Sequence, residues 1–270
     1  MKSEVMTTIA SQTGAGLPLY AEGSIVSSPK RLARIAGLLY LAVGILGAFA
    51  FAAVYSTMYV AGDAAATASK LVANAGLVKI GLAGDLIQVT IWVFLALTLY
   101  VLLRHVSGYA ARAMVVLVAI GASISFLNIL FEFQGMRVAT DPAYSATVGA
   151  AGATAMALLM LELQHYGYAI AGIFFGLWLV PLGYLAFKSA MFPKVLGIVL
   201  VVGGVGYLFD TLAAFVAPDL TPIIHPIAAL LGIVAEVSLL VYLLVKGVRS
   251  PAASDERPSS TASVPAPTSA

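Results

Sequence analysis

Six stretches of the chain are almost continuously apolar, and segments with charged residues, Gly or Pro separate them, the longest of these between the third and fourth stretches. A hydrocarbon core about 30 Å thick requires about 20 apolar residues in helical form, so each stretch is long enough to cross a membrane. Because backbone groups in lipid must bond within their own segment, we predict an all-α polytopic membrane bundle with six transmembrane helices and outer interfacial helices. The predicted spans cover about residues 35–60, 80–103, 113–133, 166–187, 195–216 and 223–245.

Composition supports this class and limits the chemistry. Apolar residues make up 61% of the chain and charged residues 10%, with a mean hydropathy of +1.01. Soluble domains carry about 25% charged residues, so this chain has too few charged residues to form a water-facing surface. It has no cysteine, which excludes disulfides and thiolate metal sites, and it carries no phosphate loop, nucleophile elbow or basic patch for nucleic acid. The lipid bilayer is the expected partner, nucleic acid is excluded, and the oligomeric state stays open.

The two ends of the chain differ from its middle. Residues 1–29 and 249–270 are rich in small and polar residues and lack a long apolar run. We therefore expect two disordered cytoplasmic tails around a transmembrane domain of residues 30–248. Residues 63–79 carry apolar positions at helical spacing among charged and polar ones, which predicts an interfacial helix. In the fourth span, Pro181 removes a backbone hydrogen bond and predicts a kink.

The positions of Lys and Arg predict the orientation, because these residues concentrate in cytoplasmic loops. With six spans and the amino terminus inside, 3 of the 14 basic residues lie outside, which leaves 11 inside. A seventh span over residues 148–164 would change this distribution to 6 inside and 8 outside. We therefore predict six spans with both termini in the cytoplasm. Residues 150–164 are then an outer interfacial or re-entrant helix.

Ionisable residues inside the predicted spans are the main functional signal. Such a residue costs about 2.5–3.5 kcal/mol in hydrocarbon on insertion scales, so it normally faces a protein interior or a wet cavity. Asp85 shares one helical face with Gln88 and Trp92. The predicted topology places most of the acidic residues in the outer half of the membrane, with Glu236 near the midplane. The candidate residues for a ligand or ion pocket are Asp85, Gln88, Asn128, Glu132, Asp210, His225 and Glu236.

Several functions fit such a pocket, and the sequence leaves them open. We predict a multi-pass membrane protein that binds a small or amphiphilic ligand or ion in an outer polar cavity, as transport and binding proteins do. One alternative is a metal-assisted intramembrane hydrolase, in which a divalent ion activates water. Another is a structural or accessory subunit whose polar groups hold helices in register. The candidate metal ligands are His165, His225, Asp85 and Asp210, and the two histidines are also candidates for haem. Whether the protein is an enzyme, and which cofactor it uses, stays open.

Five runs of residues carry a resemblance to a known family. They are RLARIAGLLYL (31–41), GDLIQVTIWVFLALTLY (84–100), SFLN (125–128), GYAIAGIFFGLWLVPLGYLAFKS (167–189) and FPKVLGIVLVVGGVGYLFD (192–210). Taken together, they resemble the bacterial membrane-protein family called domain of unknown function 4386, over about residues 30–247. The resemblance implies a multi-span protein of the bacterial cytoplasmic (inner) membrane. It carries over no catalytic residue.

Overall fold

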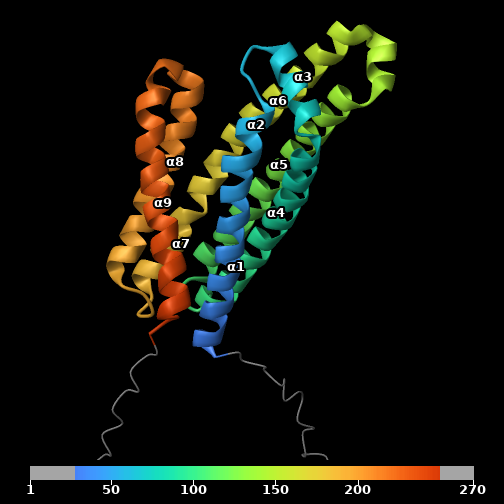
Figure 1. Cartoon of the computed structure of the whole chain (residues 1–270). Helices are drawn as coiled ribbons and strands as arrows, with labels where there is room; N and C mark the ends of the chain where they lie inside the picture. The colour runs from blue at the N-terminus through green and yellow to red at the C-terminus, as the bar shows by residue number, and fades with distance from the viewer. Residues whose placement is uncertain (1–27, 250–270) are drawn as a thin grey trace, which may run out of the picture.

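The computed structural model describes residues 28–249, and all regular structure within them is helical (Figure 1). Six of its helical segments are long and apolar enough to cross a membrane, which confirms the predicted all-α membrane bundle. The predicted tails, residues 1–29 and 249–270, lie almost entirely outside the described residues. The six segments are Pro29–Met58, Ala75–Leu103, Gly108–Thr140, Pro142–Lys188, Lys194–Val216 and Pro218–Val245.

Three of the six spans are single helices, and the first, fourth and sixth combine more than one element. The elements are α1 (Pro29–Phe49), the π-helical η1 (Ala50–Tyr55), α2 (Ser56–Met58), α3 (Ala64–Ala73), α4 (Ala75–Leu103), α5 (Gly108–Thr140), α6 (Pro142–Leu177), α7 (Leu179–Lys188), α8 (Lys194–Val216), the 3-10 turn η2 (Pro218–Leu220) and α9 (Thr221–Val245).

The first span begins at a helix cap and contains a change of helix type. The Ser28 side chain accepts a hydrogen bond from the Arg31 backbone N–H at 3.3 Å, and Pro29 occupies the first turn, where no N–H is needed. After Phe49 the span continues as the π segment η1. Such segments are rare and are frequently found at functional sites. The last residue of η1, Tyr55, faces the cavity described below.

The polar segment after the first span forms α3 and the start of α4. Asp63 caps α3, since its Oδ1 accepts from the Ala66 N–H at 2.9 Å. Asn74 separates the two helices, and its side-chain amide donates to the carbonyl oxygens of Lys70 at 3.0 Å and Thr57 at 3.2 Å. The amide therefore ties α3 to the end of the first span. Helix α3 packs on α5 and α6 at the same end of the bundle.

The long segment after α5 differs from the sequence prediction. We expected a separate helix at residues 150–164 followed by a span from residue 166, but α6 runs through this point without interruption to Leu177. The break lies earlier, at Gly149, whose φ of 78° is a conformation that side-chain-bearing residues rarely adopt. Within residues 150–164, Ala157 and Leu161 pack against Gly135 of α5. With 47 residues, Pro142–Lys188 is about twice as long as one membrane crossing requires.

The predicted interruption at Pro181 is present. Helix α6 ends at Leu177, and α7 begins at Leu179. Pro181 has no N–H to donate to the carbonyl of Leu177, four residues earlier, so the helix cannot continue regularly there. The residue at the break is Trp178, which is almost fully buried at 2% exposure. The break therefore places a large indole ring inside the bundle.

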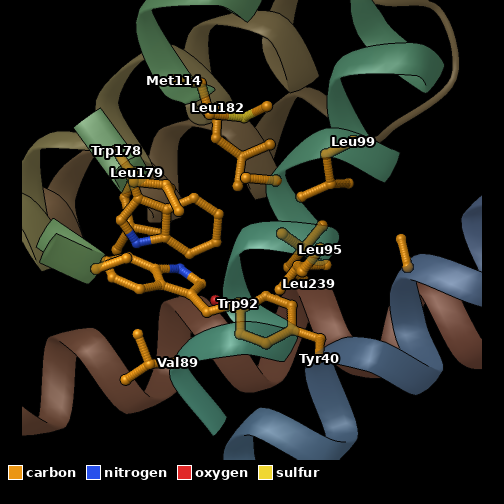
Figure 2. Packing of buried hydrophobic residues seen from close by; sticks show 14 of the residues in the cluster. Tyr40, Val89, Trp92, Leu95, Leu99, Met114, Trp178, Leu179, Leu182 and Leu239 are labelled. Carbon is orange, nitrogen blue, oxygen red and sulfur yellow. The ribbon is translucent and has the colours of Figure 1, made fainter. Parts of the chain in front are cut away.

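The spans form two groups that α6 and α7 connect (Figure 1). Helices α1, α4 and α5 pack together, the hairpin of α8 and α9 lies on the other side, and α6 contacts both α5 and α8. Helix α1 also contacts α9, which closes the arrangement. We call the end of the bundle where α1 begins and α9 ends the terminal end, and the other the opposite end. An apolar core fills the terminal half, where Leu95, Leu99, Met114, Leu182 and Leu239 meet (Figure 2).

Glycines bring the backbones of the fourth and fifth spans into contact. A Cβ added to Gly204 of α8 would lie 2.6 Å from the carbonyl oxygen of Gly176 in α6. The same distance separates a Cβ at Gly197 from the carbonyl oxygen of Gly183 in α7. Small residues permit this close approach, which is a common means of helix association in lipid. The two glycine pairs therefore fix how α8 lies along α6 and α7.

We predict that Gly204→Ala destabilises the protein. The added methyl group would collide with the Gly176 carbonyl, so the two helices must separate, at a cost of about 1–3 kcal/mol. Gly44→Ala is the matched control, because Gly44 lies in α1 and an added Cβ there would meet no described atom within 4 Å. The free energy of unfolding in mixed micelles measures both effects. Equal stability of the two variants would contradict the proposed helix contact.

Candidate functional site

A cavity of about 150 Å³ lies inside the bundle, and residues from all six spans line it. Its wall combines carboxylates, amides and aromatic rings, and no Lys, Arg or His of residues 28–249 lines it. The lining residues are Tyr40, Val43, Tyr55, Asp85, Gln88, Val89, Trp92, Ser125, Asn128, Ile129, Tyr168, Phe175, Trp178, Tyr207 and Glu236. Four of the predicted pocket residues are therefore in one place: Asp85, Gln88, Asn128 and Glu236.

Asp85 is bonded to a tyrosine of the neighbouring span. The carboxylate is 5% exposed, and its Oδ2 accepts a hydrogen bond from the Tyr55 hydroxyl at 3.2 Å. Tyr55 ends the π segment η1, and α1, η1 and α4 pack together along this contact. The change of helix type thus occurs where the first span supplies a donor to a buried acid.

Glu236 has a similar partner on the other side of the cavity. The Tyr207 hydroxyl of α8 donates to Glu236 Oε1 of α9 at 3.0 Å. The Tyr207 ring lies against Gly232, one turn before Glu236, where an added Cβ would come within 2.8 Å of the ring. Gly232 therefore leaves the space that the ring needs to reach the acid. The cavity contains two tyrosine–carboxylate pairs, each made by two neighbouring spans.

Helix α5 contributes polar groups that have no partner among the described residues. Asn128 is 4% exposed, and its side-chain nitrogen makes no hydrogen bond to protein. The side chain packs directly on the backbone of Gly167 in α6. One turn along α5, Glu132 is fully buried with both carboxylate oxygens unpaired. Glu132 is not part of the cavity wall, and it lies within electrostatic range of Asp85.

Aromatic rings form a continuous arc along the cavity wall. Consecutive rings in the arc have centroids 5.2–6.1 Å apart, and most of the pairs are edge-to-face. Figure 2 shows the indoles of Trp92 and Trp178 next to each other, with the ring of Tyr40 beyond them. Edge-to-face pairs are favoured by the ring quadrupoles, so the arc holds a defined shape. In order, its rings are those of Tyr40, Trp178, Trp92, Phe175, Tyr168 and Tyr55.

The remaining candidate residues lie elsewhere. His225 Nδ1 and Asp210 Oδ2 are 2.8 Å apart near the opposite end of the α8–α9 hairpin, and the histidine side chain is 55% exposed. His165 stacks on the ring of Tyr59, with centroids 5.5 Å apart. The expected metal ligands His165, His225, Asp85 and Asp210 therefore do not form a cluster. The predicted topology gave all four a similar depth in the membrane, but they contact different neighbours, so they do not form the expected metal site. Within residues 28–249, no group of three or more acidic or histidine side chains is placed to hold a metal ion.

Sequence reasoning missed the two tyrosine partners. Tyr55 and Tyr207 lie in apolar runs, where a tyrosine is most often packing or an interface residue. The available signal was indirect: a buried carboxylate requires a donor, and tyrosine is one of the side-chain donors that the spans contain. Phe175 and Trp178 of the fourth span were not among the candidate residues either, and both line the cavity.

We predict that Tyr55→Phe lowers the stability of the protein. The change leaves the Asp85 carboxylate without its donor, which costs about 1–3 kcal/mol for a buried polar group. Tyr109→Phe is the control, because Tyr109 is 81% exposed and should change stability by less than about 0.5 kcal/mol. Denaturation in mixed micelles compares the two variants. A loss no greater than that of the control would show that the hydrogen bond is unimportant.

Comparison with known proteins supports the family resemblance of the sequence. A family model described as domain of unknown function (DUF4386) matches residues 35–247. No curated protein and no solved structure matches the chain. The matched region includes all six spans apart from the first residues of α1, and it contains the whole cavity wall. The chain belongs to the DUF4386 family of domains of unknown function.

Proposed function

We propose that this protein binds a small polar molecule in the cavity between its six spans, as a membrane protein of the transport or binding type. The observation that carries the proposal is the cavity wall, which gathers two carboxylates and two amides inside an apolar bundle. Polar groups inside a membrane are costly, and they commonly mark the path of a substrate or ion. A purely structural network would instead bury its polar groups against each other without leaving space.

The two carboxylates lie at different depths, which supports a path through the bundle. Glu236 lies 9 residues before Val245 at the terminal end of α9, or about 14 Å along the helix. Asp85 lies 18 residues before Leu103 at the same end of α4, or about 27 Å. A ligand moving along the cavity would therefore meet one acid after the other. The volume of about 150 Å³ is close to that of a cavity that binds benzene, so it limits the ligand to a small molecule or to the head of an amphiphile.

We place the protein in the cytoplasmic membrane of a bacterium, as the family resemblance implies, and the distribution of basic residues supports an orientation with both termini inside. Among the described residues, 9 Lys and Arg lie at the terminal end and 3 at the opposite end. This asymmetry follows the positive-inside rule. The 9 residues are Lys30, Arg31, Arg34, Arg104, Arg112, Lys188, Lys194, Lys246 and Arg249, and the 3 are Lys70, Lys79 and Arg137.

The orientation can be tested with single cysteines, because the chain has none of its own. Asp219→Cys places a thiol in the exposed turn η2 at the opposite end, and Ala190→Cys places one in the exposed turn between α7 and α8. In intact cells, a membrane-impermeant maleimide should label the Asp219→Cys variant and leave the Ala190→Cys variant unlabelled until the membrane is permeabilised. Labelling of the Ala190→Cys variant in intact cells would reverse the proposed orientation.

A wet cavity predicts a large difference in thiol reactivity between two serines of α5. Ser125 lines the cavity, whereas Ser123 is on the exposed face of the same helix, where lipid covers it. A thiol reacts as the thiolate, which forms readily near water and poorly in apolar surroundings. In proteoliposomes, Ser125→Cys should therefore react with N-ethylmaleimide about tenfold faster or more than Ser123→Cys. Equal slow rates would reject the ligand-binding proposal and favour a structural role.

A further inference from the structure

We propose that the cavity recognises a small organic cation, a quaternary or tertiary ammonium group with a hydroxyl-bearing arm, of which choline is the simplest example. This inference rests on the proposed function, since it names the chemical class of ligand for the same cavity. It follows from three separate features of the wall: its charge, its aromatic arc and the unpaired amide of Asn128.

The charge of the wall favours a cation. Asp85 and Glu236 line the cavity, Glu132 lies behind it near Asp85, and no basic side chain is among the described lining residues. The partners of the two lining acids are tyrosine hydroxyls, which donate hydrogen bonds and carry no positive charge. A bound cation would supply the missing charge. With a neutral or anionic ligand, the acids would have to take up protons or stay ionised without a counter-charge, which is costly in an apolar bundle.

The aromatic arc favours an organic cation over a metal ion. An ammonium group binds the face of Trp, Tyr or Phe when it lies within about 6 Å of the ring centroid. Six rings in contact along one wall offer this environment from several directions. Calcium, by contrast, takes about six to eight oxygen ligands. Within residues 28–249, no group of three or more acidic or histidine side chains is placed to supply such a ligand set.

An unpaired amide indicates where the hydroxyl of the ligand would lie. The Asn128 side-chain nitrogen lines the cavity without a hydrogen-bond partner among the described residues, and the residue is 4% exposed. A buried donor without a partner is costly, so a ligand oxygen that accepts from this amide would be favoured. The cavity volume of about 150 Å³ suits a cation of the size of choline.

The protein contains its own reporter for this site. Its two tryptophans, Trp92 and Trp178, both line the cavity, so intrinsic fluorescence reports on the cavity wall. We expect choline to change the fluorescence of the full-length protein saturably in phosphatidylglycerol nanodiscs. The neutral isostere 3,3-dimethyl-1-butanol has carbon in place of the charged nitrogen. It should reach half of its maximal fluorescence change at a concentration about tenfold higher or more.

Substitutions identify the side chains that recognise the positive charge of choline. Asp85→Asn and Glu236→Gln keep the shape of each side chain and should weaken choline binding about tenfold or more. Asp219→Asn, in the exposed turn at the opposite end, should bind choline like the original protein. Melting temperatures show whether each variant is folded. The comparison of choline with its isostere uses the original protein, so it still tests the inference if a substitution prevents folding.

Three results would overturn the inference, and they separate it from the proposed function. Equal affinity for choline and its isostere would show that the site does not recognise a positive charge, while the proposal of a small-molecule site would stand. Unchanged choline binding by folded Asp85→Asn and Glu236→Gln variants would show that neither acid recognises the cation, which would also overturn the inference. No response to either ligand would reject the ammonium class, while the reactivity of Ser125→Cys decides separately whether a ligand cavity exists. A weakened response to free choline in phosphatidylcholine nanodiscs would identify the lipid headgroup as the source of the same ammonium group.

Discussion

The burial of carboxylates in an apolar bundle is the constraint on which the rest of this structure depends. No basic side chain of the described residues meets Asp85 or Glu236 in the cavity wall, and each takes a hydrogen bond from a tyrosine of the next span. One pair joins the first span to α4, and the other joins α8 to α9. Because each pair holds only when the two spans are in register, the acids order the helices on both sides of the cavity.

Much of the fold could be predicted from the sequence, because crossing a membrane requires long apolar runs that are easy to recognise. The break before Pro181 was also predictable, since it follows from a missing N–H. The continuity of α6 was not. Residues 150–164 are apolar enough for several roles, and only their packing against Gly135 of α5 shows that they extend the fourth span.

The candidate site was predicted in part, and the pattern of success has a physical cause. Helical spacing and topology give depth along the membrane, which is why Asp85, Gln88, Asn128 and Glu236 were all selected. They do not give the direction in which each helix faces. Asp210 was expected in the same pocket, yet it pairs with a histidine of its own hairpin. Which faces meet is decided by tertiary packing, and no spacing rule supplies that information.

The size of the side chains explains why a cavity persists inside a bundle that is closely packed elsewhere. Where glycine faces glycine, as at Gly176 and Gly204, helices touch through their backbones. The residue before Gly176 is Phe175, and three residues after Gly204 comes Tyr207, and both of these rings line the cavity. Glycine and aromatic residues thus lie close together on these helices: a Cβ added to Gly176 would come within 2.9 Å of the Tyr207 Cβ, so the glycine contact also leaves room for this side chain. Removing a ring should therefore change the shape of the ligand site more than the path of the helices, because the glycine contacts that hold the backbones would remain.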